Sequence, residues 1–334
     1  MGLGSVEEGA RTAVEVCMAV KDGEHVLILT DRVTLDVGKA IAGAAERVTK
    51  GNVRLLILED YVERPAKEMP KQILDLIPWA NVTFYAAESK PGELSIRGPF
   101  IRNAVKYARH AHMPSITKKL METGMCADYK RIAELTWKIE RVVKGCKKAR
   151  VMNKAGTELN VEFHPSWRWK PCDGLYHEKG LWGNLPEGEI FTAAYKANGR
   201  MVIDELGDWF SPKYGALTET PVTLQVKDSR VDTNSVECAN EQLRKEFIQY
   251  LSTDPYSNKL GEFAIGTNIF LKELTGVLLQ DEKFPSVHCA FGDPYPDETG
   301  ADWSSKTHID GIMLKCNIWI DGKQIMDEGK HLID

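Results

Sequence analysis

The sequence lacks the features that would place it in a membrane or outside the cell. No stretch of its 334 residues approaches the ~20 consecutive apolar residues that cross a bilayer. Met1 to Glu8 has neither the basic start nor the apolar stretch of a signal peptide. The seven cysteines are scattered and include no C-x-x-C pair, which disfavours a disulfide framework and a structural zinc site. We therefore expect a cytoplasmic protein with reduced thiols and no membrane partner.

The sequence also lacks the marks of a nucleotide or nucleic-acid binder. The formal net charge is −5, whereas a nucleic-acid binder usually carries a basic surplus on part of its surface. Neither G-x-G-x-x-G nor G-x-x-x-x-G-K-[ST] follows the apolar run that ends at Thr30, so the loop that cradles a nucleotide phosphate is missing. We expect no nucleic-acid partner and a scaffold role for the N-terminal half.

What is present indicates an α/β protein of two domains. A single core rarely grows past roughly 250–300 residues, and this chain is longer. Over residues 1–147, short apolar runs alternate with amphipathic stretches, which is typical of an α/β domain with a largely parallel sheet. The predicted strands cover 25–30, 53–58 and 81–85, and the predicted helices cover 10–19, 35–49, 101–109 and 129–147.

Residues 148–334 have a different pattern, which predicts a C-terminal β-rich α+β domain. A short turn containing Gly156 predicts a hairpin over 151–161. The other predicted strands cover 190–195, 200–203, 222–226 and 311–320, and the one clear helix covers 241–250. We expect this domain to bind a metal and to carry the catalytic residues, for the reasons that follow.

Acids and histidines stand among small and apolar residues in the C-terminal half. If His308 and Asp310 lie on one strand, alternation places them on the same face, where they can converge on one ion. His288, Glu189 and Glu262 each stand in an apolar strand pattern, where an acid is costly to bury unless it is paired or bound to a metal. Each residue alone would more often be structural. Together they predict a metal site centred on His308 and Asp310.

Four motifs in this half follow one another in an order that resembles a known family. They are N-L-P-x-G-E-[IV]-F-T from Asn184, G-E-x-A-x-G-x-N from Gly261, H-x-A-x-G-x-x-Y-P from His288 and H-x-D from His308. This order resembles the aminopeptidase T/aminopeptidase S family of metallopeptidases, which also includes relatives of the 2,5-dihydroxypyridine dioxygenase type. The resemblance covers residues from about 184 to 322.

The resemblance implies a pair of divalent metals and a full set of ligands. Carried over motif by motif, the ligands are Glu189, Glu262, His288, Tyr295, His308 and Asp310, with Glu262 as the bridge between the metals. Mixed nitrogen and oxygen ligands suit Zn²⁺, Co²⁺ or Mn²⁺, and we expect one or two such ions per chain. Either Glu262 or Glu187 is expected to accept the proton of the attacking water.

The resulting hypothesis is a metallohydrolase: an aminopeptidase that hydrolyses N-terminal peptide bonds through a metal-activated water. The resemblance also implies a homodimer that acts on a peptide or another small substrate. A mononuclear Fe(II) ring-cleaving dioxygenase is the alternative, with His288, His308 and Asp310 as its three ligands. A binding protein without catalysis is a third possibility. His110 and His112, near the end of a predicted helix, are expected to be exposed.

Overall fold

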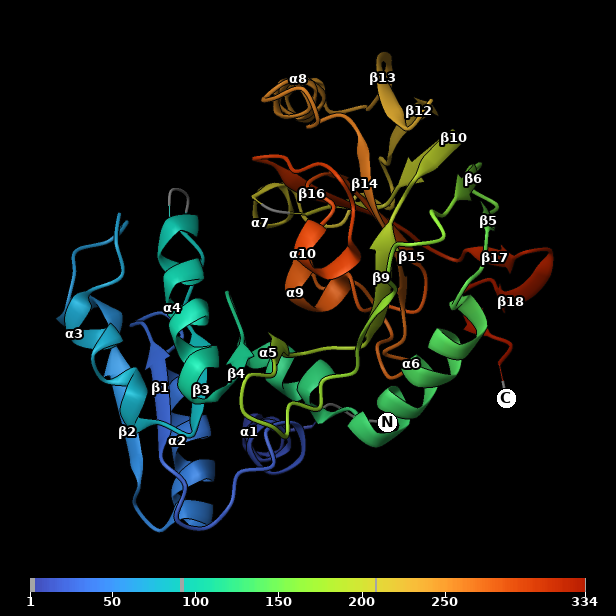
Figure 1. The fold of residues 1–334 in the computed structure, drawn as a ribbon. Helices are drawn as coiled ribbons and strands as arrows, with labels where there is room; N and C mark the ends of the chain where they lie inside the picture. Colours follow the sequence, from blue (N-terminus) through green and yellow to red (C-terminus); the bar gives the residue numbers. More distant parts are fainter. Residues whose placement is uncertain (1–3, 91–92, 208, 334) are drawn as a thin grey trace. The chain divides into compact units, whose positions relative to one another are not determined.

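The computed structural model describes residues 4–90, 93–207 and 209–333 and divides them into two compact units (Figure 1). Unit 1 comprises the described residues up to Ala133 together with Gly174–Glu187, and unit 2 comprises Glu134–Asp173 and the described residues from Gly188 onward. The predicted domain boundary between residues 147 and 148 stays a prediction. Among the described residues, no helix is both long and apolar enough to cross a membrane.

Unit 1 is built on a five-stranded parallel sheet, as predicted for the N-terminal half. The strand order is β2-β1-β3-β4-β8, and all four neighbouring pairs are parallel. Every residue of β1 and β3 is buried, and apart from Thr30 and Thr83 these segments are apolar, as expected for inner strands of a parallel sheet. The strands are β1 (Val26–Thr30), β2 (Val53–Ile57), β3 (Val82–Ala86), β4 (Arg109–His112) and β8 (Trp182–Asn184).

The helices of unit 1 cover this sheet. Ser5 begins the first helix with a capping box, in which its hydroxyl accepts from the backbone N–H of Glu8. Phe100 of α4 packs in one core cluster with Leu27, Leu29 and Tyr85 from the sheet. The helical segments are α1 (Val6–Arg11), η1 (Thr12–Cys17), α2 (Leu35–Thr49), η2 (Leu58–Asp60), α3 (Lys71–Leu74), η3 (Ile77–Trp79), α4 (Leu94–Tyr107), α5 (Lys118–Glu122) and η4 (Gly124–Cys126).

The expectation that His110 and His112 are exposed is wrong. Both lie on β4, and their side chains are buried, with 0% and 6% of their surface exposed. The segment Arg109-His-Ala-His carries no apolar run, so the sequence gives no strand signal there. The strand forms because β3 and β8 pair with it on either side.

Unit 2 contains two antiparallel sheets. An eight-stranded sheet has the order β13-β12-β10-β6-β5-β17-β18-β19, and a six-stranded sheet has the order β11-β16-β15-β14-β9-β7. The strands of the first are β5 (Lys148–Met152), β6 (Glu158–Glu162), β10 (Lys196–Ile203), β12 (Val222–Lys227), β13 (Arg230–Glu237), β17 (Asn317–Ile320), β18 (Lys323–Asp327) and β19 (Lys330–His331). Those of the second are β7 (Lys170–Cys172), β9 (Glu189–Ala193), β11 (Glu205–Leu206), β14 (Leu260–Gly266), β15 (Val287–Gly292) and β16 (His308–Met313).

The core of unit 2 joins the two sheets. Val161 and Leu224 of the eight-stranded sheet share one apolar cluster with Phe263, Cys289 and Ile309 of the six-stranded sheet. Burying each large apolar side chain contributes about 1.5–3 kcal/mol. Because side chains alternate along a strand, the residues between these core positions point to the opposite face of the six-stranded sheet. The helices of this unit are α7 (Phe210–Tyr214), α8 (Glu241–Tyr250), α9 (Leu278–Asp281), α10 (Pro296–Thr299) and most of α6 (Tyr129–Val143).

The predicted strand over 311–320 is in fact two strands in different sheets. β16 ends at Met313 in the six-stranded sheet, and β17 begins at Asn317 in the eight-stranded sheet. Between them, Lys315 has a φ of 51°, a left-handed conformation that lets the chain change direction. Apart from this break, the fold class is confirmed: an α/β unit with a parallel sheet and a β-rich C-terminal region.

Candidate metal centre

Five of the six predicted ligands lie on one face of the six-stranded sheet. In the register of β14, β15 and β16, Glu262 is opposite Ala290, which is in turn opposite Asp310. His308 and His288 stand two residues before Asp310 and Ala290, and Glu189 stands on β9 beside β14, opposite Gly266. Figure 1 shows β9, β14, β15 and β16 next to one another. The residues that alternate with them, such as Cys289 and Ile309, belong to the core.

Small residues leave room between these ligands. Ala193 and Ala290 flank Glu262 on the neighbouring strands, and Ala264 is opposite His288. The register of β14 against β15 shifts between Leu260 and Glu262, an irregularity of the kind that often re-aims a side chain at a functional site. On this face, acid and imidazole groups therefore alternate with small side chains.

The ligands form two clusters that share Glu262. The first cluster is Glu189, Glu262 and His288, and the second cluster is Glu262, His308 and Asp310; within each, one ligand atom per residue lies within 4.8 Å of the others. In the first cluster, His288 Nε2 is 3.2 Å from Glu189 Oε2 and 3.3 Å from Glu262 Oε1. In the second, His308 Nε2 is 3.6 Å from Asp310 Oδ1 and 3.8 Å from Glu262 Oε2. Glu262 thus presents one oxygen to each cluster.

The charges of the site favour a cation. Burial alone would lower the pKa of His308, but Asp310 and Glu262 raise it to about 10. Burial opposes the protonation of His288 as well, and there Glu189 and Glu262 raise the pKa well above its ordinary value. Both imidazoles thus attract protons because the carboxylates around them are in excess. Since a histidine must be neutral to bind a metal, a divalent cation would displace these protons.

The pKa values of the three carboxylates are shifted in different directions. Burial would raise the pKa of Asp310, but His308 lowers it to about 2. In the same way Lys283 and His288 lower the pKa of Glu189 to about 2 against the effect of burial. For Glu262, burial is the larger effect and raises its pKa, despite His288 and His308. Glu262 is therefore the most basic carboxylate among these three ligands.

A backbone contact fixes the orientation of His308. Its Nδ1 lies 2.8 Å from the carbonyl oxygen of Asp293, so the Nδ1–H tautomer donates there and Nε2 faces the second cluster. A histidine that binds a metal almost always donates its other ring N–H in this way, which fixes both its tautomer and its direction.

Tyr295, the sixth predicted ligand, stands beside the second cluster. It precedes α10 in a left-handed conformation with a φ of 51°. Its ring centroid lies 4.5 Å from that of His308 and 5.8 Å from that of Phe191, and 42% of its surface is exposed. The ring forms part of the outer wall of the cluster, and its role as a ligand stays a prediction.

Glu187, a predicted proton acceptor, belongs to unit 1 and to neither cluster. Its Oε2 accepts from the hydroxyl of Tyr176 at 3.0 Å and from the backbone N–H of Asn184 at 3.1 Å. Its own backbone N–H donates to the hydroxyl of Tyr129 at 3.1 Å. These contacts of the buried carboxylate hold the turn before β9 in place, and its catalytic role stays a prediction.

One pair of residues at the site was not expected from the sequence. Lys283 is fully buried, and its Nζ lies 2.6 Å from Glu189 Oε1 and 2.7 Å from Glu282 Oε1. Burial raises the pKa of Glu282 to about 8, in part against the effect of Lys283. The run Gln280-Asp281-Glu282-Lys283 reads as an exposed loop, and its local pattern gives no sign that the lysine is buried.

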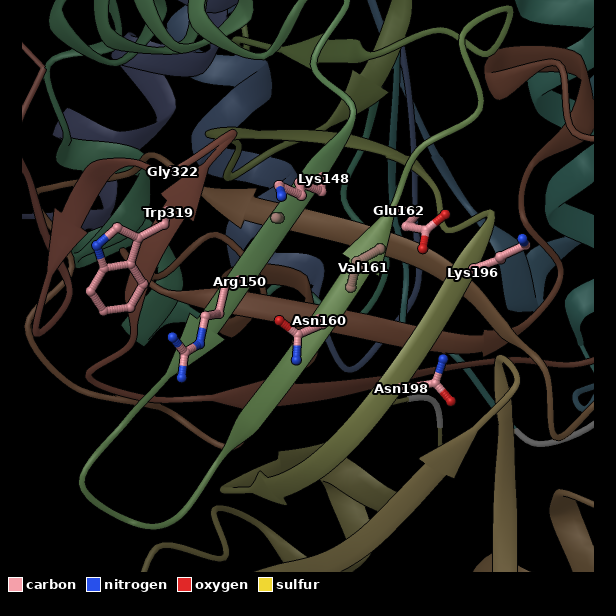
Figure 2. A pocket seen from close by; sticks show the side chains of 10 residues that line it. Lys148, Arg150, Asn160, Val161, Glu162, Lys196, Asn198, Trp319 and Gly322 are labelled. Carbon is pink, nitrogen blue, oxygen red and sulfur yellow. The ribbon is translucent and has the colours of Figure 1, made fainter.

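A hollow elsewhere in unit 2 carries none of this chemistry. A groove of about 430 Å³ on the eight-stranded sheet is lined by residues such as Lys148, Arg150, Asn160 and Trp319 (Figure 2). None of the predicted ligands lines it. Among the described residues, the groups of three or more acids, cysteines and histidines that could hold a metal are the two clusters that share Glu262.

Two solved structures share the fold over nearly the whole chain. The 2,5-dihydroxypyridine dioxygenase from Pseudomonas putida KT2440 is similar with a TM-score of 0.71 and 16% sequence identity, covering 98% of this chain and 97% of that chain. AmpT from Thermus thermophilus is similar with a TM-score of 0.71 and 14% identity, covering 98% of this chain and 99% of that chain. These identities establish likeness of fold alone. A comparison with curated proteins found no match.

A family model gives the assignment. The model described as thermophilic metalloprotease (M29) matches residues 119–318, which include both clusters and Tyr295. The match covers more than half of the chain, so the resemblance seen in the four motifs is confirmed. The protein belongs to the thermophilic metalloprotease (M29) family, whose members are metal-dependent hydrolases.

Proposed function

We propose that this protein is a metal-dependent aminopeptidase that uses Glu189, Glu262, His288, His308 and Asp310 to hold one or two divalent cations. The observation that carries the proposal is the pair of clusters joined by Glu262. The family match supports a metal-dependent peptidase, and the order of the four motifs, which resembles aminopeptidases T and S, supports attack at the N-terminus of a peptide.

The residues of the site fit a divalent metal. Glu189 Oε2 is buried, and although His288 Nε2 lies 3.2 Å away, no described residue gives this oxygen a well-aligned hydrogen bond, so it is placed to accept a cation. Two imidazoles and three carboxylates are a donor set suited to Zn²⁺, Co²⁺ or Mn²⁺. Tyr295 stands close enough to His308 to add a sixth group to this ligand set on binding.

The bound metal and the residues of the site have different proposed roles in the reaction. A bound divalent cation supplies Lewis acidity, which polarises a carbonyl oxygen and makes a water molecule more acidic. Glu262 stands in both clusters and is the most basic of the three acid ligands, so it is the proposed acceptor of the water proton. His308, fixed through Asp293, holds its Nε2 toward the reaction site. Phe191 and Tyr295 form an aromatic wall beside it.

The dioxygenase alternative requires a different grouping. It needs His288, His308 and Asp310 around one iron, whereas in the described residues each histidine shares a cluster with Glu262. Because the fold is similar to that of 2,5-dihydroxypyridine dioxygenase, the test below also includes this alternative. The homodimer, the cytoplasmic location and the identity of the metal stay predictions.

The test compares peptides with free and with acetylated N-termini, using protein loaded with Zn²⁺, Co²⁺ or Mn²⁺. We expect release of the first residue from free peptides only. Glu262→Gln should lower this activity by a factor of at least about a hundred, since even loss of an outer partner of a metal ligand costs 10–100-fold. Cleavage of acetylated peptides at internal bonds would contradict the aminopeptidase. Oxygen uptake with Fe(II) and 2,5-dihydroxypyridine, without peptide cleavage, would favour the alternative.

A further inference from the structure

The first cluster already contacts a lysine. The ammonium of Lys283 is 2.6 Å from Glu189 Oε1, and none of the lysine's surface is exposed. One of the two oxygens of Glu189 is therefore engaged by a cation that belongs to the chain. Oε2, which faces His288 at 3.2 Å, is the oxygen that remains for a metal.

The backbone fixes the ammonium in this position. A Cβ built on Gly266 would lie 1.9 Å from the carbonyl oxygen of Phe284, so the segment that carries Lys283 rests directly on the glycine opposite Glu189. The backbone N–H of Gly266 donates to the carbonyl oxygen of Ser286 at 3.0 Å, and that of Asn268 donates to the carbonyl oxygen of Lys283 at 3.1 Å. The lysine is therefore held from both sides of the segment.

The second cluster differs in this respect. Within residues 4–90, 93–207 and 209–333, no lysine or arginine nitrogen lies within 4.0 Å of a carboxylate oxygen of Glu262 or Asp310. The partners that the structure gives these two acids are the histidines of the clusters. The two clusters share an acid but not a cation.

We infer that Lys283 makes the two metal sites unequal, so that the second cluster (Glu262, His308, Asp310) binds one divalent cation tightly and the first cluster (Glu189, Glu262, His288) binds another much more weakly. The ammonium repels a dication placed on the other oxygen of the same carboxylate, and it limits Glu189 to one oxygen as a ligand. Glu282 Oε1 lies 2.7 Å from the same ammonium and offsets part of this repulsion when it is ionised. The inference rests on the proposed metal-dependent function and assigns its number of resident metals.

This inequality gives the first site a distinct character. Its occupancy would follow the free metal concentration, while the second site stays filled. The chain would then hold one metal under scarce supply and two under ample supply. The lysine acts here as a positioning and charge-setting residue through Glu189; it is not in contact with the substrate.

The test measures metal binding to stripped protein by calorimetric titration with Zn²⁺ and with Mn²⁺, together with elemental analysis after dialysis. For the unaltered protein we expect one tight ion per chain and a second that binds at least about a hundredfold more weakly. In Lys283→Met the second ion should bind about ten- to a hundredfold more tightly. Lys323→Met removes an exposed lysine of the same unit and should leave both affinities unchanged.

A second pair of variants keeps the inference testable if Lys283→Met fails to fold. Glu189→Gln should retain the tight ion and lose the weak one, and His308→Ala should lose the tight ion. Two ions of equal affinity in the unaltered protein, an unchanged second affinity in a folded Lys283→Met, or the reverse pattern in the second pair would overturn the inference and leave the proposed function standing. Failure of the unaltered protein to bind either metal would overturn the proposed function itself.

Discussion

Both units of the protein bury charged side chains, but they balance them differently. In unit 1, Arg64 is buried between Asp31 and Glu93 and forms ion pairs with both. The oxygens of Asp31 also accept from the backbone N–H groups of Thr34 at 2.8 Å and Glu88 at 2.7 Å. In unit 2, three acids and two histidines meet with a single lysine beside them, and Glu189 Oε2 has no hydrogen-bond partner in the described chain.

The difference shows whether buried acids are balanced within the chain or are suited to an external cation. The unit 1 network lies just beyond the carboxyl ends of β1 and β3. The strand order 2-1-3 changes direction between these two strands, and doubly wound sheets usually bind their ligand at such a point. In this protein the guanidinium of Arg64 occupies that position, so the charges of Asp31 and Glu93 are balanced by a cation of the chain itself. In the unit 2 clusters three acids meet one lysine, so their charges suit a cation from outside the chain.

The largest effect is expected from removing Arg64 from the ion-pair network of unit 1. Arg64→Met leaves Asp31 and Glu93 buried without their cation, which should lower the free energy of unfolding of unit 1 by about 3–5 kcal/mol. Urea unfolding would measure the change. Arg32→Met is the matched control, because Arg32 pairs with Asp60 at 3.4 Å on the surface and should cost less than about 1 kcal/mol. Equal losses in the two variants would contradict the comparison.

A somewhat smaller effect is expected from removing metal from the two clusters of unit 2. Metal at about 100 times its Kd should stabilise the folded protein by about 2.7 kcal/mol, and a chelator should remove this gain. Glu262→Gln, which takes a ligand from both clusters, should make the urea midpoint insensitive to metal and to chelator. An Arg64→Met protein that still folds should keep its metal dependence, since its change lies in the other unit.

The smallest effect concerns an acid of unit 2 outside the clusters. Burial and the neighbouring Asp281 raise the pKa of Glu205 from about 4.5 to about 9. The folded state therefore holds this proton more strongly than the unfolded state does. Stability from this group is present below pH 4.5 and is lost as the pH rises toward 9. Glu205→Gln should thus be more stable than the unaltered protein at pH 9, by about 1–3 kcal/mol, and similar to it near pH 4.

Urea unfolding at pH 5 and at pH 9 would check this prediction. The advantage of Glu205→Gln should appear only at the higher pH. An equal advantage at both pH values would mean that the substitution changes packing around Ser211, whose hydroxyl donates to Glu205, and not the titration of the acid.

Much of the fold and of the site could be predicted because the signals are local. The helices predicted over 35–49 and 241–250 have the bounds of α2 and α8, since apolar spacing and caps such as Asn240 are encoded within one or two turns. The strand alternation of His308 and Asp310 is equally local, and the structure places them in one cluster.

The remainder depends on distant partners. Lys283 is buried because it meets Glu189, which is 94 positions away in the chain, and no local pattern encodes that contact. β4 is a strand because β3 and β8 pair with it, although Arg109-His-Ala-His is polar. Gly174–Glu187 returns to unit 1 after a stretch of unit 2, which periodicity cannot reveal.

That returning segment has a consequence for how the protein is made. β4 ends at His112, and β8, which covers its edge, begins at Trp182. At synthesis rates of about 5–20 residues per second, the ribosome needs roughly 4–14 s to add the intervening chain. During that time the nascent protein presents an unpaired parallel strand, an edge that invites wrong pairing. Substitutions in Gly174–Glu187 should therefore lower the yield of folded protein during translation more than they lower the stability of the finished molecule.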